Sequence, residues 1–361
     1  MSSTPTFPAL PTDTLFDIAD LLSVPDLSAL SRTCRSLHVL FTRPLVRRVQ
    51  RSLSTCLFHV MQSNNNVRLL TYLLDEGLPV DCTIPAYEIW RRPVCTILHL
   101  AADSGSDALV RLLIDRGANI SAATTVDTEA HVQRAWVMDS ESLDVPVGST
   151  PLHCAAAKGH DVVSMLLIEN GAVVCAAAKN GKTPLHCAAY EGHVAMCDLL
   201  IENGAVVCAA TERGETPLHV ATYDGQAVVC QLLLSKGANV SAVTDEGQTP
   251  LFFAAQLRYA KVARLLIANG ADVSIADKAG RTPLHNAAMH GKVVVAALLI
   301  EKGANVAAVD NLGQMPIQVA IDFMQDDVVA LLRDRSPPFA RETLNRSAIR
   351  FGILPPLTGY L

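Results

Sequence analysis

The residues best suited to chemistry in this chain are histidines that recur at one place in a repeated pattern. Each ends a Thr-x-Leu-His tetrapeptide, and the set is His99, His153, His186, His219 and His285. A neutral imidazole is a common metal ligand, yet no acidic or thiol partner accompanies the whole set. We therefore expect each ring to bond backbone groups of adjoining turns, and we predict no metal site and no cofactor.

Motifs for other kinds of catalysis are missing from the sequence. There is no GxxxxGK[ST] phosphate loop, no GxSxG nucleophile elbow and no HExxH zinc motif. The net charge of −6 argues against nucleic acid as the main partner. No apolar run reaches the roughly 18 to 20 residues of a membrane-spanning helix. The sequence predicts a non-enzyme with no catalytic residues and no nucleic-acid or membrane partner.

Ten cysteines lie in the chain, and several recur in register. Pairs 33 residues apart are Cys154 with Cys187, Cys175 with Cys208, and Cys197 with Cys230. We expect these to be small buried residues of neighbouring units, about 8–10 Å apart and too distant for a disulfide. With no CxxC pair and no secretory leader in residues 1–10, the thiols predict an intracellular location, in the cytoplasm, the nucleus or both.

A period of 33 residues governs most of the chain. The tetrapeptide or a relative of it begins at Thr150, Thr183, Thr216, Thr249, Thr282 and Met315, and a Gly-Ala pair follows each of the five threonines. This pattern resembles ankyrin repeats, in which each unit is a turn followed by two helices. We predict an all-α ankyrin-repeat solenoid of about eight units over residues 55–335. Such arrays bind proteins and rarely catalyse reactions.

The repeated positions have mechanical roles within a unit. Thr183 can cap the first helix, and Pro184 fits its first turn because its missing N–H would be unpaired there. Leu185 and two alanines are expected to face the neighbouring unit. The second helix is expected to supply an apolar stripe of Met196, Leu199, Leu200 and Ile201. Gly204 is expected to end that helix in a left-handed conformation.

Residues 7–48 precede the array and carry two apolar stripes at helical spacing. Pro25 separates the stripes, which predicts two or three short helices. Because two or three short helices cannot bury much surface alone, we expect this segment to need a partner. Its candidate partner-binding residues are Leu10, Pro11, Leu15, Ile18, Leu22, Leu27, Leu30 and Cys34.

These residues resemble the F-box motif, whose form is Leu-Pro, an acidic residue, spaced apolar positions, Asp-Leu, and then Cys-Arg. A tryptophan common near the Cys-Arg is absent here, where Leu37 and His38 stand. The resemblance implies docking on a Skp-type linker subunit that joins a cullin, with the repeats holding a protein to be ubiquitinated. The combination of F-box and ankyrin repeats is typical of filamentous fungi.

Two alternatives to this interpretation remain at the level of sequence. Residues 10–48 could be a helical cap that covers the first repeat. The protein would then be an ankyrin scaffold or inhibitor that sequesters a partner without recruiting a ubiquitin ligase. In either case we expect the chain to be monomeric by itself.

The client protein is expected to bind the turn tips and the exposed ends of the first helices. Aromatic residues at exposed positions are common interface anchors, which makes Tyr190 and Tyr223, expected to stack, the first candidates for a hot spot. An equally open alternative is that both rings pack on neighbouring helices. The candidate residues are Lys179, Asn180, Lys182, Tyr190, Glu191, Glu212, Arg213, Glu215, Tyr223, Asp224, Asp245, Glu246, Gln248, Gln256, Lys278, Arg281, Met289 and His290.

Three further segments lie outside the regular period. An acidic insertion spans residues 121–149, and Trp136 near its middle could anchor a basic partner or fold back on the array. Residues 336–361 are predicted to form a short capping helix at 341–349 and a proline-containing tail. Residues 1–6 are predicted to be disordered.

Overall fold

A computed structural model describes residues 66–75, 77–84, 94–125, 146–257 and 260–335. These ranges contain 15 helices and one two-stranded sheet. The chain divides into two compact units, one comprising Met1–Ala155 with Val162–Val173 and the other Ala156–Asp161 with Val174–Leu361. The expected all-α architecture is confirmed, with the small sheet as an addition.

The first unit holds the less regular part of the array. Its helices are α5 (Asn66–Asp75), α6 (Ile97–Ser104) and α7 (Asp107–Asp115), and α7 packs against both of the others. The strands β1 (Thr83–Ile84) and β2 (Cys95–Thr96) pair antiparallel, with Thr83 opposite Thr96. Helices α8 (Pro151–Lys158) and α9 (Asp161–Glu169) straddle the division between the units.

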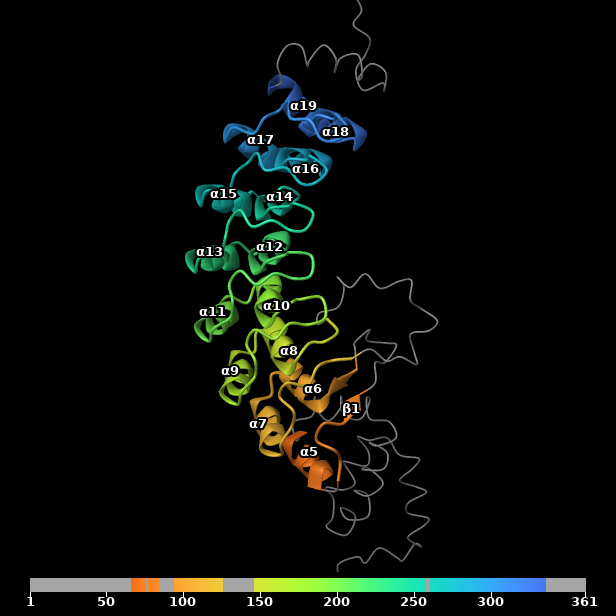
Figure 1. The fold of residues 1–361 in the computed structure, drawn as a ribbon, viewed down its shortest axis with the longest axis vertical. Helices are drawn as coiled ribbons and strands as arrows, with labels where there is room; N and C mark the ends of the chain where they lie inside the picture. Colours follow the sequence, from red (N-terminus) through yellow and green to blue (C-terminus); the bar gives the residue numbers. More distant parts are fainter. Residues whose placement is uncertain (1–65, 76, 85–93, 126–145, 258–259, 336–361) are drawn as a thin grey trace, which may run out of the picture. The chain divides into compact units, whose positions relative to one another are not determined.

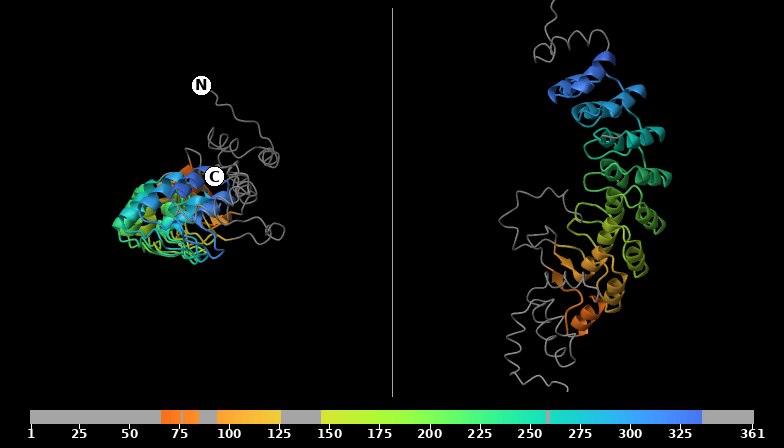
Figure 2. Two further views of the ribbon diagram at one scale, coloured as in Figure 1. Left: turned by 90° about the horizontal axis from the view of Figure 1, so that it is seen from above. Right: turned by 180° about the vertical axis from the view of Figure 1, so that it is seen from behind.

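The second unit is a stack of helix pairs. First helices α10, α12, α14, α16 and α18 contact one another in succession, and the second helices run beside them (Figure 1). Figure 2 shows the same pairs from behind. The bounds are α10 (Pro184–Glu191), α11 (Val194–Glu202), α12 (Pro217–Tyr223), α13 (Ala227–Ser235), α14 (Pro250–Ala254), α15 (Lys261–Ala268), α16 (Pro283–Met289), α17 (Val293–Glu301), α18 (Pro316–Asp322) and α19 (Asp326–Arg335).

The start and end of each first helix follow from the repeated motif. Thr183 is the N-cap of α10 in an extended conformation, and Pro184 occupies the first turn. Gly192 ends the helix with φ +84°, a left-handed conformation that costs glycine little. The roles predicted for Thr183 and Pro184 are therefore confirmed, and Gly204 after the second helix has the predicted left-handed φ of +93°.

The core is built from small residues on the first helices and larger ones on the second. Leu185 and the two alanines that follow the Cys187 position are fully buried, which allows the first helices to approach closely. Met196 and Leu200 of α11 are also fully buried. Leu199 and Ile201 are only half-buried, so the predicted stripe is narrower than expected.

Neighbouring turns of the second unit are joined by a ladder of backbone hydrogen bonds. In each step an N–H of one turn donates to a carbonyl of the preceding turn, at 2.8–3.0 Å. The steps run from Glu212 to Asn180, from Asp245 to Arg213, from Lys278 to Glu246 and from Asn311 to Ala279. The ladder satisfies polar backbone groups that would otherwise be exposed at the turns, and it fixes the spacing of the side chains they carry.

The cysteines divide into buried and exposed sets. All eight described cysteines are free thiols. Burial was correctly predicted for Cys154, Cys187, Cys197 and Cys230, but it was wrong for Cys175 and Cys208, which are exposed. Both lie in a turn that follows a second helix, where the thiol of Cys175 donates to the Gly204 carbonyl at 3.3 Å.

Several predictions fall outside the described residues. They concern the F-box-like segment at 7–48, the terminal segments 1–6 and 336–361, and residues 126–145 of the insertion. The described residues contain seven helix pairs and the single helix α5, so the first helix of the expected eighth unit also lies outside them. Among the described residues, no helix has the length and apolar character needed to cross a membrane.

Candidate functional site

The repeated histidines are fixed between adjacent turns. Nδ1 of His186 accepts the Thr183 N–H at 3.1 Å, and Nε2 lies 3.1 Å from the carbonyl oxygen of Glu215 in the next turn. A ring that accepts at Nδ1 must carry its proton on Nε2, so Nε2 donates to Glu215. Three other rings repeat this bridge, with His99 joined to Ser149, His219 to Gln248 and His285 to Gln314.

Burial keeps these imidazoles neutral. It lowers the pKa of His99, His186 and His219 from 6.5 to about 4. No group of three or more His, Cys, Asp or Glu side chains in the described part of the chain could hold a metal ion. The expected backbone bonding is confirmed for these histidines, and for His153 the Thr150 N–H donates to Nδ1 at 3.0 Å.

The predicted client-binding residues lie on the turns and at the ends of the first helices, and none of them is buried. Lys179, Tyr190, Glu191, Glu212, Arg213, Tyr223, Asp224, Asp245, Glu246, Lys278 and His290 are exposed. Asn180, Lys182, Glu215, Gln248, Gln256, Arg281 and Met289 are half-buried. Burial and the nearby Lys292 lower the pKa of the His290 side chain.

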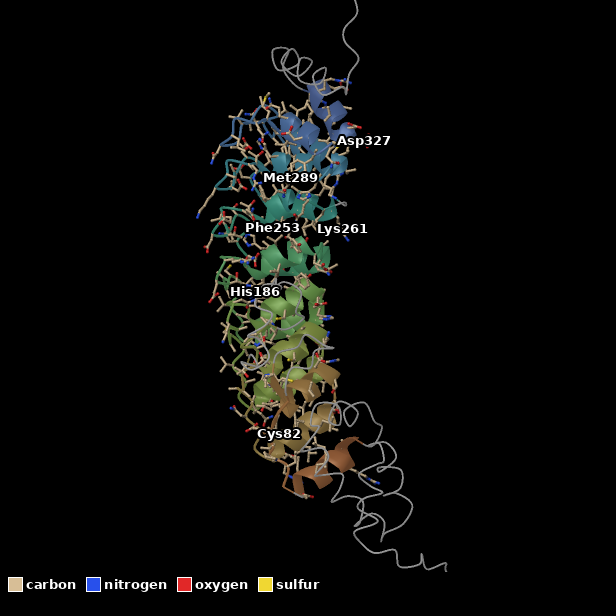
Figure 3. The ribbon with its side chains drawn as sticks, turned by 90° about the vertical axis from the view of Figure 1, so that its right-hand side faces the viewer. Cys82, His186, Phe253, Lys261, Met289 and Asp327 are labelled. Atoms are coloured by element: carbon tan, nitrogen blue, oxygen red, sulfur yellow. The ribbon has the colours of Figure 1, made fainter. Side chains whose placement is uncertain are left out.

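In the last repeat, one hydrogen bond joins the base of the turn to the end of the first helix. Nε2 of Gln314 donates to Oδ2 of Asp322 at 2.8 Å, across the length of α18. The repeat places Glu215 and Tyr223 at the equivalent positions of an earlier unit. In Figure 3 His186, Phe253 and Met289 follow the line of first helices, with Lys261 to one side on the second helices. The turns that carry the candidate residues are joined in series by the backbone ladder, and their first helices contact one another in succession within the second unit.

An aromatic cluster lies on these first helices. The ring centroids of Tyr223 and Phe253 are 6.2 Å apart at 75°, and those of His219 and Phe253 are 5.7 Å apart at 84°. Tyr190 and Tyr223 nevertheless stay 38% and 49% exposed. Sequence reasoning missed Phe253, although a large ring stands there at the position of Cys187 and Val220 in the two preceding units.

Arg281 has a structural partner that the sequence reasoning did not assign. Its guanidinium makes two hydrogen bonds to Oδ2 of Asp277, at 2.9 and 3.1 Å, and the Asp277 side chain is only 2% exposed. The other carboxylate oxygen accepts the N–H groups of Ala279 and Arg281. Arg281 therefore stabilises its own turn and is less available to a ligand than Lys278.

The remaining predicted site residues lie outside the described ranges. These are Trp136 and the F-box-like positions Leu10, Pro11, Leu15, Ile18, Leu22, Leu27, Leu30 and Cys34.

Comparison with known families agrees with the arrangement of repeats. A model for ankyrin repeats (3 copies) matches residues 132–211, 206–277 and 269–339, and a single-repeat ankyrin model matches 95–125. An F-box-like model matches residues 7–52. No curated protein matches the chain significantly.

Both kinds of module are typically non-catalytic and mediate protein interactions, so the chain has the organisation of an interaction adaptor. Because the three-copy matches together cover residues 132–339 of 361, the chain belongs to the ankyrin-repeat family.

Proposed function

We propose that this protein is the substrate-recognition subunit of a cullin-type ubiquitin ligase. The F-box-like segment docks on a Skp-type linker, and the ankyrin repeats bind the client protein. The observation that carries the proposal is the order of modules, with an F-box-like match at residues 7–52 ahead of the repeats. A repeat array alone would favour a scaffold, whereas an F-box-like segment would connect the array to the ligase by binding the linker.

The linker-binding residues of the proposal are the apolar ones of the F-box-like segment. Leu15, Ile18 and Leu22 recur at helical spacing, as expected for a stripe that packs on a partner. Such a stripe is hydrophobic enough to supply most of the binding free energy if it becomes buried. Removing two of its side chains should therefore abolish linker capture.

The client-binding half of the proposal uses the surface of turns and first-helix ends. Its exposed side chains are not needed for stacking, because stacking uses the buried alanines, the histidine bridges and the backbone ladder. The surface can therefore vary in sequence without loss of the fold. A client-recognition module requires this separation between the residues that stack the repeats and the residues that contact the client.

The experiment is capture of the full chain by the purified linker–cullin pair. Wild-type protein is compared with Leu15→Ala/Ile18→Ala and with the matched control Thr14→Ala/Asp17→Ala, which changes the same segment beside the stripe. Circular dichroism establishes that each variant retains the folded array. We expect capture of the wild type and the control and loss of capture in the stripe variant.

Two outcomes would overturn the adaptor proposal. Failure of the wild-type chain to be captured would leave an ankyrin scaffold whose N-terminal segment is a cap. Equal capture of the stripe variant would remove residues 10–34 from the linker contact.

A further inference from the structure

Stacking of the repeats leaves Tyr190, Tyr223 and Phe253 incompletely buried, and these three rings are called the aromatic surface below. Unit-to-unit packing uses small residues such as Ala188 and Ala221, which are fully buried. Tyr190 and Tyr223 remain 38% and 49% exposed. Large rings that stay half-exposed are typical of residues that anchor a partner.

The Tyr223 ring is held in place before any partner arrives. It packs edge-to-face on Phe253, which packs in the same manner on His219. His219 is in turn fixed by the Thr216 N–H at 3.1 Å and by the carbonyl of Gln248 at 3.1 Å. A ring that is already ordered loses little conformational entropy on binding, so its contact contributes more to affinity.

Carboxylates outnumber cations around the aromatic surface. The stretches 179–191, 212–224 and 245–257, each a turn with the first helix that follows it, carry the carboxylates Glu191, Glu212, Glu215, Asp224, Asp245 and Glu246 and the cations Lys179, Lys182 and Arg213. The Gln226 amide donates both to Oδ2 of Asp224 and to the Tyr190 backbone carbonyl, so it bridges this carboxylate to the end of α10. Glu215 and Tyr223 occupy the repeat positions of Gln314 and Asp322, whose side chains are joined by a hydrogen bond.

The chemistry of these groups selects one kind of occupant. A cation within about 6 Å of a tyrosine or phenylalanine ring is attracted to the face of the ring. Carboxylates next to the ring add charge-assisted hydrogen bonds and speed the encounter. A phosphate or an acidic peptide would instead be repelled at the same place.

We propose that the aromatic surface binds a basic segment of the client protein, with a lysine or arginine side chain against Tyr223 and its charge near Glu215 and Asp224. The inference rests on the proposed function for the existence of a client and adds the chemistry of the segment recognised.

The test measures fluorescence anisotropy of a short labelled peptide rich in arginine, with leucine and glycine spacers, titrated with the full chain. Its counterpart has glutamate in place of every arginine. We expect binding of the arginine peptide only, and an affinity about tenfold lower in Tyr223→Ala, because loss of a cation–ring contact costs about 1–2 kcal/mol. Tyr223→Phe keeps the ring and should bind like the wild type.

Two further variants separate this surface from general effects. Val228→Ala removes a 59% exposed side chain from α13 in the same unit and should leave the affinity unchanged. Glu215→Gln/Asp224→Asn should weaken binding and flatten its dependence on salt. Circular dichroism checks that each variant is folded.

The inference is overturned if the wild type does not bind the arginine peptide, binds both peptides equally, or binds it as well after Tyr223→Ala. These results do not depend on the linker. A chain that binds the peptide but is not captured by the linker–cullin pair would retain this surface and refute the adaptor role. A chain that is captured by the linker–cullin pair but does not bind the peptide would retain the adaptor role and refute this surface.

Discussion

The Nε2 atom of His186 lies 3.1 Å from the carbonyl oxygen of Glu215, while Nδ1 of the same ring accepts the N–H of Thr183. One side chain therefore caps its own helix and ties it to the next turn. An imidazolium carries protons on both nitrogens and cannot accept at Nδ1. Protonation would break the bond to Thr183 and place a charge on a buried ring, so the stability of the helix cap depends on pH.

The first prediction is a loss of stability on mild acidification. The pKa of His99, His186 and His219 is about 4 in the folded state and 6.5 in the unfolded state, so between these values the unfolded chain binds more protons. Their contribution is complete above about pH 6.5 and falls as the pH drops towards 4. Between pH 7 and 5 the contribution of each histidine to the free energy of unfolding should fall by about 2 kcal/mol. Denaturant titration at the two pH values measures the change.

A control for the pH effect is present in the chain itself. Gln318 occupies the histidine position of the last helix pair, and its Oε1 accepts the Met315 N–H at 2.7 Å. His186→Gln should therefore keep the cap without a titrating group. We expect its stability to fall less than that of the wild type between pH 7 and 5. An identical slope for the two proteins would refute the role assigned to His186.

The second prediction concerns the close approach of neighbouring turns. A Cβ atom on Gly214 would lie 2.9 Å from the backbone nitrogen of Asp245, whereas one on Gly204 would meet nothing within 4 Å. Both glycines have positive φ, at +75° and +93°, so alanine pays about 1 kcal/mol of strain at either site. Gly214→Ala should cost about 1 kcal/mol more, because it also disturbs the hydrogen bond from Asp245 to Arg213.

Equilibrium unfolding of the two glycine variants provides the comparison. Equal losses would mean that the turns can separate without cost and that the backbone ladder contributes little to stability.

The residues that the period itself constrains were predictable from the sequence. Thr183, Pro184 and Gly204 have roles set by the geometry of a helix end, and the period repeats that geometry in every unit. The same reasoning could locate the surface of turns and helix ends, since stacking leaves only those positions free. These local rules act over a few residues, which is why they can be read along the chain.

The contacts between units were harder to predict. Tyr223 and Phe253 are 30 positions apart, and their ring contact depends on how far one first helix is displaced from the next. The exposure of Cys175 and the pairing of Arg281 with Asp277 likewise depend on the path of the backbone outside the helices. A period gives the spacing of such residues but not the direction in which a link or turn points their side chains.

The third prediction tests a polar contact inside the stack. Nδ2 of Asn286, a buried residue of α16, donates to the carbonyl of Phe252 in α14 at 2.7 Å. Asn286→Ala should destabilise the chain by about 1–2 kcal/mol, since it removes a buried hydrogen bond and leaves a small void. The comparison is Asn203→Ala, whose amide bonds the Leu199 carbonyl at an exposed helix end. That variant should change the free energy of unfolding by no more than about 0.5 kcal/mol. A similar loss of stability in both variants would show that the buried hydrogen bond contributes no more than the exposed one.

The fourth prediction follows from the division of the thiols. Burial raises the pKa of Cys187 and Cys197 to about 12 and that of Cys230 to about 11, whereas Cys175 and Cys208 are exposed. Alkylation requires the thiolate and access to it. Brief treatment of the folded chain with iodoacetamide near pH 8 should therefore label Cys175 and Cys208 before Cys187, Cys197 and Cys230, which should react only after denaturant is added. Mass spectrometry of the peptides identifies each site, with Cys175→Ser and Cys208→Ser as controls for assignment. Early labelling of Cys197, at the centre of α11, would mean that the helix pairs open in the native protein more readily than their packing indicates.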